Sequence, residues 1–414
     1  MAVIVQKYGG SSVATPKHLK NVAQRVAQRK REGHDVVVVV SARGETTDEL
    51  IELAQELLPE PTAAGSEYDA LLATGEKEAA ALMAMALIAE GLSAISMNGA
   101  QAGILTDSIH SKARISGFDA RSIQKELARG KVVIVAGFQG ADSNGRITTL
   151  GRGGSDITAA ALAAGLGAAR CEIFKDVLGF YTADPRQVPE AAKLHELTYD
   201  EAMELASVGA AITHPRAIEI ARRYKIPIAI LHTFSEAEGT WIKESLLMEN
   251  VHAIRGVVAD KNIVKISILG VPDKPGVAAN FFVPLGKARI KTDMIVQNIS
   301  HEGRSDISFV VAQSDAREAL RAVQQAAAPL GSVEIQFDPE IAKVSIVGGG
   351  IASHAEVAGE MFECFSKEKI NIEMISTSEI KISCAVRKQQ ADQAVRALHN
   401  HFGLQNQKLE ASRA

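Results

Sequence analysis

Cysteine is scarce in this sequence. Cys171, Cys364 and Cys384 are the three cysteines among 414 residues, an odd number at wide spacings. This pattern predicts neither a disulfide framework nor a zinc site, and it suits a reducing cytoplasm. The eleven histidines form no ligand cluster; His399 and His401 are two residues apart and do not share a helix face. We therefore expect a cytoplasmic protein without disulfides or a zinc site.

Long apolar runs and basic tracts are missing as well. Apolar runs, such as Val36–Val40, are shorter than the ~18–20 residues of a membrane span. The first residues, MAVIVQKYGG, lack the charged and apolar regions of a signal peptide. A net charge of −4 with no basic tract argues against nucleic acid as the main partner. With 46% apolar residues, the sequence predicts a soluble globular protein of two or three domains.

Strand-like and helical segments alternate over the first 245 residues. Val3–Gln6 and Val36–Val40 are apolar, and each is followed by a turn containing glycine and serine and then by a helix. The alternation predicts an α/β fold with a doubly wound, mostly parallel sheet. Ligands of such sheets bind beyond the carboxyl ends of the strands. The further strands are predicted at 93–97, 131–137, 171–174 and 228–231, and helices at 16–31 and 70–90.

A glycine-rich stretch, Thr148–Ala164, joins a strand-like tail to a run of high helix propensity. Its centre reads GRGGSD, residues 151–156. Glycines allow the backbone to approach a ligand closely, and Ser155 or Asp156 suits a helix N-cap, where an anion is favoured. Arg152 can hold a carboxylate or phosphate through two hydrogen bonds. The stretch predicts an anion-binding loop, with an ordinary strand–turn–helix joint as the alternative.

Lys7 lies at the end of the first strand, just before the turn Gly9–Ser11. A lysine charge and glycine N–H groups can hold a phosphoryl group, although a surface lysine beside a turn has the same pattern. The spacing fits neither GxxxxGK[ST] nor GxGxxG. Glu76 and Thr47 lie near predicted helix starts, where either substrate binding or capping explains them. The 181–186 turn could hold a nucleotide base and phosphate, or lie at the surface without a ligand.

Two copies of one unit occupy residues 264–310 and 342–386. ISILG at 266–270 matches VSIVG at 344–348, and IKTDMI at 290–295 matches INIEMI at 370–375. Each copy predicts the ferredoxin-like βαββαβ pattern. Because neither copy has an acid–base cluster, we expect ligand sensors or pairing surfaces. The expected domains are 1–245, a linker at 246–262, 263–340 and 341–414.

Several motifs together resemble bacterial aspartate kinase, in particular the short, monofunctional lysine-pathway form with tandem ACT domains. The resemblance covers nearly the whole chain. Its motifs are KYGGSSV at 7–13, VVVVSARGETTDEL at 37–50, TGE at 74–76, TTLGRGGSDITA at 148–159, YTADPR at 181–186 and MISTSEIKIS at 374–383.

The resemblance implies an amino-acid-kinase domain that uses ATP with Mg²⁺ to phosphorylate the side-chain carboxylate of L-aspartate. This is the first step towards lysine, threonine and methionine. The carboxylate is already ionised at neutral pH, so catalysis reduces to positioning and charge neutralisation. The residues implied to be catalytic are Lys7, Arg152 and Asp156. Those implied to bind aspartate are Ser41, Thr47, Glu76, Arg152 and Ser155, with Ser155 and Asp156 on the phosphate and metal side. Those implied to bind ATP are Lys7, Tyr8, Gly9, Gly10, Ser11, Lys175, Asp176, Tyr181, Arg186, Ala211 and Ile212.

The resemblance also implies feedback by lysine, threonine or both at pockets between ACT modules, and a homodimer or higher oligomer formed through these modules. Glu356 stands where glycine is usual, so we expect the pocket with the 273–277 turn to respond more strongly. Met248 could start a separately translated small subunit, or be a plain linker residue. The residues implied to bind effectors are Asp273, Gly276, Val277, Asp293, Gln297, Asn298, Asn371, Ile372, Thr377 and Glu379.

The chain departs from the family pattern at Arg43, Ile157, Lys175 and Leu178, where methionine, threonine, threonine or serine, and aspartate are usual. Lys175 could add a phosphate contact. Two other functions remain open from the sequence. One is a kinase of another amino-acid carboxylate, and the other is a non-catalytic regulator that senses amino acids.

Overall fold

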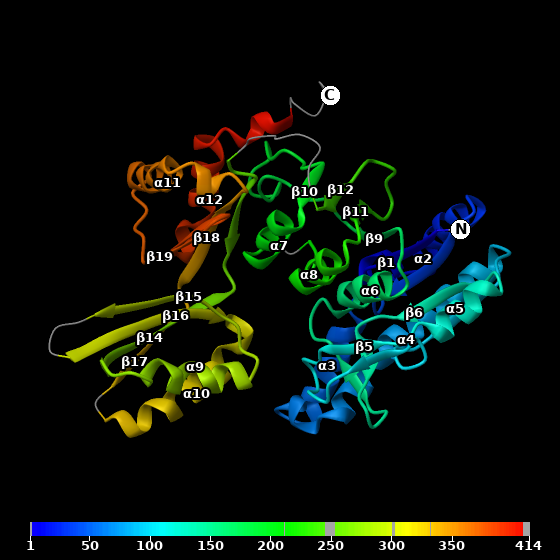
Figure 1. Ribbon diagram of the computed structural model, residues 1–414, viewed down its shortest axis with the longest axis horizontal. Helices are drawn as coiled ribbons and strands as arrows, with labels where there is room; N and C mark the ends of the chain where they lie inside the picture. Colours follow the sequence, from blue (N-terminus) through cyan, green and yellow to red (C-terminus); the bar gives the residue numbers. More distant parts are fainter. Residues whose placement is uncertain (1, 211, 245–252, 300–302, 332, 409–414) are drawn as a thin grey trace. The chain divides into compact units, whose positions relative to one another are not determined.

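The computed structural model describes residues 2–210, 212–244, 253–299, 303–331 and 333–408 (Figure 1). It divides into two compact units. The first comprises Met1–Phe180, Lys193–Ser207 and Ala211–Glu249, and the second comprises Tyr181–Ala192, Val208–Ala210 and Asn250–Ala414. The suggested start at Met248 lies outside the described residues. No helix within the described ranges is long and apolar enough to cross a lipid bilayer.

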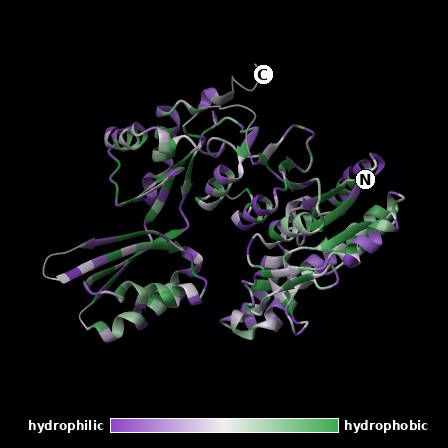
Figure 2. Ribbon diagram, viewed as in Figure 1, coloured by the Kyte–Doolittle hydropathy of each residue, from purple (hydrophilic) through white to green (hydrophobic). Residues whose placement is uncertain are grey.

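An eight-stranded sheet forms the centre of the first unit, in the order β10-β12-β11-β9-β1-β2-β6-β3. Neighbouring strands are parallel except β11 and β12. The central strands β2 and β6 are apolar apart from Asp35 (Figure 2), as expected for strands covered on both faces. The predicted doubly wound, mostly parallel sheet is therefore confirmed. Its strands are β1 (Val3–Tyr8), β2 (Asp35–Val40), β3 (Ala94–Met97), β6 (Val132–Ala136), β9 (Arg170–Lys175), β10 (Glu196–Thr198), β11 (Ile228–His232) and β12 (Thr240–Lys243).

Helices cover both faces of this sheet. Tyr8 packs in a buried cluster with side chains of α2 and α4, whereas α6 packs against β1 and against α8. Because successive residues of a strand point to opposite faces, Lys7 points towards α6. The helices are α1 (Gly10–Val13), α2 (Pro16–Arg31), α3 (Thr46–Leu57), α4 (Ser66–Ala89), α5 (Arg121–Ala128), α6 (Gly154–Gly165), α7 (Tyr199–Ser207) and α8 (Pro215–Tyr224).

A smaller sheet in the first unit has the order β5-β4-β7-β8. Its last strand leads through residues 150–153 into α6, so this sheet sets where the GRGGSD loop begins. Gly153, in the left-handed conformation at φ 75°, is the N-cap of α6. The four strands are β4 (Ile104–Thr106), β5 (Ile115–Phe118), β7 (Gln139–Ala141) and β8 (Ile147–Thr149).

The second unit contains two modules with the predicted repeat. The first module has the complete βαββαβ order and a four-stranded antiparallel sheet, β15-β16-β14-β17. The sheet of the second module has the order β13-β18-β20-β19. The elements of the first module are β14 (Ile263–Pro272), α9 (Val277–Lys287), β15 (Thr292–Ile299), β16 (Arg304–Ala312), α10 (Ala316–Ala327) and β17 (Glu334–Asp338). Those of the second are β13 (Gly256–Asp260), β18 (Ile341–Val347), α11 (Glu356–Lys367), β19 (Met374–Ser378), β20 (Lys381–Arg387) and α12 (Ala391–His401).

The second module corrects one prediction. No strand follows α12 among the described residues up to 408. The outer strand is instead β13, at residues 256–260, which pairs antiparallel with β18 and had been predicted as linker. The first module is thus inserted within the second, because a strand that precedes it in the chain completes the later sheet.

A segment from the middle of the chain also belongs to the second unit. Residues 181–192 contribute Ala183, Val188 and Ala191 to the core of the second module. Thr182 is buried there, and its Oγ1 lies 2.9 Å from Nε2 of the fully buried His399. A single boundary at 245 therefore does not separate the two units, because residues 181–192 belong to the second unit.

The two modules are joined by a pair of equivalent ion pairs. Lys265 Nζ lies 2.7 Å from Glu373 Oε2, and Lys343 Nζ lies 2.6 Å from Asp293 Oδ2. The two lysines hold matching places in β14 and β18, and the two acids hold matching places in the repeated sequence. The arrangement is that of an approximate two-fold axis between the modules, with the same contact made in each direction. The apolar cluster between them consists of matching pairs too: Ile263 and Ile341, Met294 and Met374, Val310 and Ala385.

Candidate active site

Three chain segments meet at the carboxyl ends of β1 and β2. A Cβ atom built on Gly10, in the turn after β1, would lie 2.8 Å from the carbonyl oxygen of Ala42. A Cβ on Gly75 of α4 would lie 2.8 Å from the Ala42 Cβ. Both positions require glycine for this close approach. The 41–44 loop is thereby held between the turn after β1 and the TGE motif of α4.

Lys7 and Lys175 share one carboxylate. Lys7 Nζ lies 2.7 Å from Asp156 Oδ1, and Lys175 Nζ lies 3.0 Å from Asp156 Oδ2. The side chains come from the ends of β1 and β9 and from the first turn of α6. Lys7 and Asp156 are only 4% and 2% exposed. Two ammonium groups around one acid, at the N-terminus of a helix, make a site that favours an anion.

These three groups change one another's ionisation. Burial lowers the pKa of Lys7 to about 8, although Asp156 opposes the shift. Burial also disfavours the charged form of Asp156, but Lys7 and Lys175 outweigh it and hold the pKa of its carboxyl well below the usual value. At neutral pH the acid is ionised and the group of three keeps a positive balance.

Glu76 is a buried carboxylate with one free oxygen. Its Oε1 accepts a hydrogen bond from the Ala42 backbone N–H at 3.1 Å. Its Oε2 is buried and has no hydrogen-bond partner among the described residues. Burial raises the pKa of Glu76 to about 7. An orphaned acceptor of this kind calls for a donor from outside the chain.

The other predicted aspartate-binding residues lie on the segments that form this site. Ser41 directly follows β2, and Thr47 lies in the first turn of α3, whose N-cap is Glu45, so Thr47 does not cap the helix. Ser155 is buried in the first turn of α6, and Arg152 is exposed in the preceding loop. Their contacts with aspartate remain predictions.

Tyr8 has a buried side chain. Its ring is fully buried and stacks on Phe174 with centroids 4.6 Å apart, and its hydroxyl donates to Gln6 Oε1 at 3.2 Å. The side chain points into the core on the face of the sheet opposite to Lys7, so the predicted ATP contact of Tyr8 falls to its backbone and stays a prediction. Gly9 is the N-cap of the short helix α1, directly after β1, and Gly10 and Ser11 are its first residues.

The remaining ATP-binding predictions fall in three places. Asp176 is exposed immediately after Lys175. Tyr181 and Arg186 lie in the 181–192 segment of the second unit, where Arg186 pairs with Asp184 at 2.7 Å. Ile212 is partly buried in the first unit, and Ala211 lies outside the described residues.

Two residues that the sequence did not indicate support the site. Thr213 Oγ1 donates to Asp156 Oδ2 at 3.3 Å. Arg216 of α8 donates to the carbonyl oxygens of Leu150 and Ala113 at 3.1 and 3.2 Å, which anchors the start of the GRGGSD loop. Thr213 follows the predicted pair 211–212, and this proximity was the one available signal.

Arg43, a departure from the family pattern, is occupied within the protein. It donates to the Ala14 carbonyl oxygen at 3.2 Å and pairs with Glu78 of α4 at 2.6 Å. Its guanidinium therefore braces the 41–44 loop against α4.

The predicted effector residues differ in their positions and contacts. Asp293 was expected to take an effector's ammonium group, but both of its oxygens are engaged, by Lys343 and by the Met294 N–H. Burial opposes its ionisation, yet Lys343 holds the pKa of Asp293 below its usual value. The turn at Asp273 and Gly276 is exposed, and Gly276, at φ 92°, is the N-cap of α9 just before Val277. The others lie in or beside the edge strands β15 and β19, namely Gln297, Asn298, Asn371, Ile372, Thr377 and Glu379.

Comparison with known proteins decides the family. The model of the amino acid kinase family matches residues 2–232, and the ACT domain model matches 266–326 and 344–402. The aspartokinase of Pseudomonas aeruginosa is 48% identical over 406 residues, which cover 98% of each chain. The chain belongs to the aspartokinase family.

Solved structures of the aspartokinase family share this fold. Escherichia coli aspartokinase III in complex with aspartate and ADP, in its R-state, has a TM-score of 0.81 at 25% identity, covering 96% of this chain and 99% of that one. The same enzyme with lysine and aspartate, in its T-state, has a TM-score of 0.71 at 25% identity, covering 97% and 99%. The family and the fold predicted from the sequence are confirmed, and the predicted enzyme class, aspartate kinase, is confirmed with them.

Proposed function

We propose that this chain transfers the γ-phosphoryl group of ATP to the side-chain carboxylate of L-aspartate and forms 4-phospho-L-aspartate. The observation that carries the proposal is the group of Lys7, Lys175 and Asp156 at the start of α6, together with the orphaned Glu76 oxygen of α4, which lies beside the loop after β2. One part suits phosphate oxygens and the other suits an ammonium group. The E. coli relative in complex with aspartate and ADP supports this pairing of ligands.

In this mechanism each residue has a separate task. Glu76 accepts hydrogen bonds from the α-ammonium group of aspartate, and Arg152 holds a carboxylate of aspartate through its planar fork. Lys7 and Lys175 neutralise charge on the phosphoryl oxygens, which matters most in the transition state. The attacking carboxylate is ionised at neutral pH, so no side chain must remove a proton from it.

The chain's residues fit a magnesium ion that arrives with the nucleotide. No group of three metal-ligating side chains occurs in the described part of the chain, and Mg²⁺ is commonly bound by one or two carboxylates together with phosphates and water. Asp156 is the carboxylate placed to join such a set. The ion would supply charge neutralisation between the phosphates, while Lys7 and Lys175 stay with the protein.

The test is ADP release by the purified chain with L-aspartate, with L-glutamate or with no acceptor. We expect release to depend on aspartate. Equal or greater release with glutamate would favour a kinase of another carboxylate. No release with either, together with measurable amino-acid binding, would favour a regulator without catalysis.

We further propose feedback by lysine or threonine at the ACT modules, consistent with a product that leads to lysine, threonine and methionine. The first module offers an exposed turn at 273–276 before the N-terminus of α9, whose N–H groups suit a carboxylate. In the second module Glu356 begins α11, and its charge would repel an effector's carboxylate there. The first turn should therefore give the stronger response. The E. coli relative solved with lysine supports a feedback role.

Feedback predicts that threonine, alone or with lysine, raises the aspartate KM or lowers kcat, and that Gln297→Ala relieves the effect. Gln297 is exposed on the edge strand β15. Gln336→Ala, an exposed glutamine on β17 at the opposite edge of the same sheet, is the matched control. Activity that is unchanged across millimolar lysine and threonine would contradict the proposal.

The edge strands β15 and β19 support dimerisation through the modules. Each carries an exposed isoleucine at a matching position, Ile295 and Ile375, and an edge strand with exposed apolar side chains is a pairing surface. We propose a homodimer or a higher oligomer, which sedimentation of the purified chain tests. A small subunit starting at Met248 would appear as a second species in mass spectrometry of protein from the native gene.

A further inference from the structure

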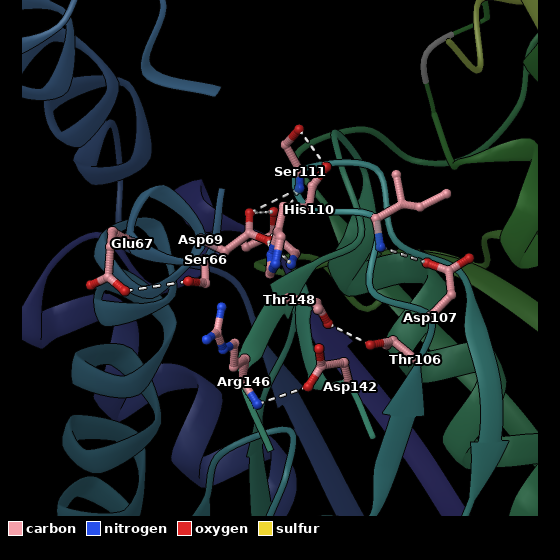
Figure 3. Close-up of polar contacts among 12 residues, drawn as sticks. Ser66, Glu67, Asp69, Thr106, Asp107, His110, Ser111, Asp142, Arg146 and Thr148 are labelled. Carbon is pink, nitrogen blue, oxygen red and sulfur yellow. Dashed lines mark hydrogen bonds and ion pairs between the residues drawn. The ribbon is translucent and has the colours of Figure 1, made fainter. Parts of the chain in front are cut away.

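Asp69 of α4 is a fully buried carboxylate with no role in the mechanism above. Its Oδ1 accepts hydrogen bonds from the Ser111 N–H at 3.0 Å and from Thr149 Oγ1 at 2.5 Å. Its Oδ2 accepts from the Thr149 N–H at 3.0 Å and lies 2.8 Å from His110 Nδ1. Figure 3 shows Asp69 pointing from its helix towards His110 and Ser111. One side chain thus holds two separate segments.

Both segments control the loop that carries Arg152. Thr149 is the last residue of β8, three positions before Arg152. Ser111 has a left-handed backbone, φ 60°, which is uncommon for a residue other than glycine. A Cβ on Gly151 would lie 3.3 Å from the Ser111 carbonyl oxygen. Asp69 therefore fixes the strand that leads into the loop and the residue against which the loop rests.

The helix that carries Asp69 also carries Glu76. Seven residues separate them, which is close to two helical turns, so both lie on one side of α4. Gln139 Nε2 donates to the Ala73 carbonyl oxygen at 3.0 Å, between these two positions, and ties the helix to β7. The separation of Glu76 from Arg152 is accordingly set by one rigid helix and one buried carboxylate.

We propose that Asp69 is a positioning residue that sets the distance between Glu76 and Arg152, the groups assigned to the two charged ends of the amino-acid substrate. This inference rests on the proposed function. In Asp69→Asn one acceptor oxygen becomes an NH₂ group that faces backbone N–H donors, so the 149–152 segment must shift. The lysines around Asp156 do not contact Asp69, and their hold on phosphate should survive.

The matched control is Asp142→Asn. Asp142 is also buried, 4% exposed, and it accepts from the Asn144 and Arg146 N–H groups at 2.9 Å. It closes the turn between β7 and β8, where Figure 3 shows it bonded to Arg146, and the Ser108 side chain also hydrogen-bonds to it. Loss of a buried carboxylate is common to both variants, but movement of the Arg152 loop is expected only in the first.

The experiment measures KM for aspartate and for ATP, with the melting temperature, in the full-length wild type and both variants. Asp69→Asn should raise the aspartate KM roughly 10- to 100-fold, since small misplacements of binding groups have effects of this size. The ATP KM should stay within about 2-fold. Asp142→Asn should leave both constants near wild type. An unchanged aspartate KM in folded Asp69→Asn, or an equal rise in both constants, overturns the inference.

If Asp69→Asn does not fold, Thr149→Val removes one of the donors and should raise the aspartate KM in the same direction. Absence of a rise in that variant also overturns the inference. If the proposed function is wrong, the wild type itself shows no aspartate-dependent ADP release, and this inference fails as well. If only this inference is wrong, the wild type is active and the aspartate KM of the Asp69 variant does not rise selectively.

Discussion

At the scale of single residues, the site depends on charges that are buried before any ligand arrives. Lys7 and Asp156 are already buried and Lys175 contacts Asp156, so little reorganisation is needed when phosphate oxygens bind. Thr213 adds a donor to the same acid. A preorganised positive site of this kind should contribute more to the rate than to ground-state binding.

Lys7→Ala should therefore lower kcat by about 100-fold or more, because one preorganised charge contact of the transition state is lost. Steady-state kinetics with saturating aspartate and ATP measure this. Lys17→Ala, an exposed lysine on α2, is the control and should have no effect. Near-normal kcat in the Lys7 variant would show that the turn after β1 does not hold the phosphates.

Glu76 should make aspartate binding depend on pH. Its pKa is raised to about 7 by burial, and the ionised form is the one that attracts an ammonium group. The value of kcat/KM for aspartate should therefore rise from pH 6 towards pH 7.5. A flat profile in pH-dependent kinetics over this range would contradict the assignment of Glu76.

The same group should reduce stability as pH rises. Its pKa is 4.5 when unfolded and about 7 when folded, so between these values the native chain binds more protons and stability falls with rising pH. The loss is complete above pH 7 and amounts to about 3 kcal/mol. Glu76→Gln should remove this pH dependence and melt higher than wild type at pH 8. If the melting temperatures of the two proteins change by the same amount between pH 5 and pH 8, Glu76 is not the source of the pH dependence.

Sequence motifs predicted Lys7 and Asp156, because they lie at a strand end and in the first turn of a helix, where local pattern carries the information. Glu76 was predicted through the TGE motif, which the structure places inside α4, ten residues after Ser66 begins the helix. Thr213 and Asp69 were missed for a physical reason. Their roles consist of hydrogen bonds to residues far away in the sequence, and neither has a periodic or glycine-rich context. The side of the sheet to which Tyr8 points follows from strand alternation, and it was overlooked because the motif as a whole was assigned to ATP.

At the scale of elements, the sequence repeat gives two modules that contact each other through two equivalent ion pairs. The two ion pairs are equivalent by position but differ in surroundings. Lys343 is 3% exposed and contacts Asp293, whereas Glu373 has both Lys265 and Arg387, the latter at 2.6 Å. The pairs should therefore differ in their contribution to stability.

Lys343→Met should lower the free energy of unfolding by about 2–4 kcal/mol, because it leaves a partly buried acid without its contacting cation. Lys265→Met should cost about 1 kcal/mol or less, since Glu373 keeps Arg387. Urea unfolding of the second unit's transition in the full chain measures both. Combining Lys343→Met with Asp293→Leu should recover most of the loss, and equal costs for the two single variants would contradict the argument.

The alternating pattern was sufficient to predict the central strands and α2, because buried strands and amphipathic helices each leave a periodic signal. It could not predict β13. The GVVAD run at 256–260 is short, and its partner strand, β18, begins about 80 residues later. Such a nonlocal pairing has no local signature, so the strand was taken for a linker.

At the scale of the whole chain, the 181–192 segment links a kinase-family sequence to the core of an ACT module. Its anchor is the Thr182–His399 contact. The other ring nitrogen of His399 is buried without a hydrogen-bond partner among the described residues. Burial lowers the pKa of His399 below its usual 6.5.

His399 should make the second unit sensitive to acid. Below pH 6.5 the unfolded chain takes up a proton that the folded chain resists, so stability is lost as pH falls. Thermal unfolding at pH 7.5 and 5.5 should show a smaller drop in melting temperature for His399→Leu than for wild type. His401→Leu, an exposed histidine on the same helix, should behave as wild type. An equal drop in all three proteins would exclude His399 as the source.

The place of the 181–192 segment has a consequence for synthesis on the ribosome. Its apolar residues pack against α12, which is made about 200 residues later. At ~5–20 residues per second, Val188 waits roughly 10 to 40 s before its partners emerge. During that interval the nascent chain exposes Ala183, Val188 and Ala191, a stretch that a chaperone can bind. The 181–192 segment can therefore reach its buried position only after the C-terminal residues of the chain have been made.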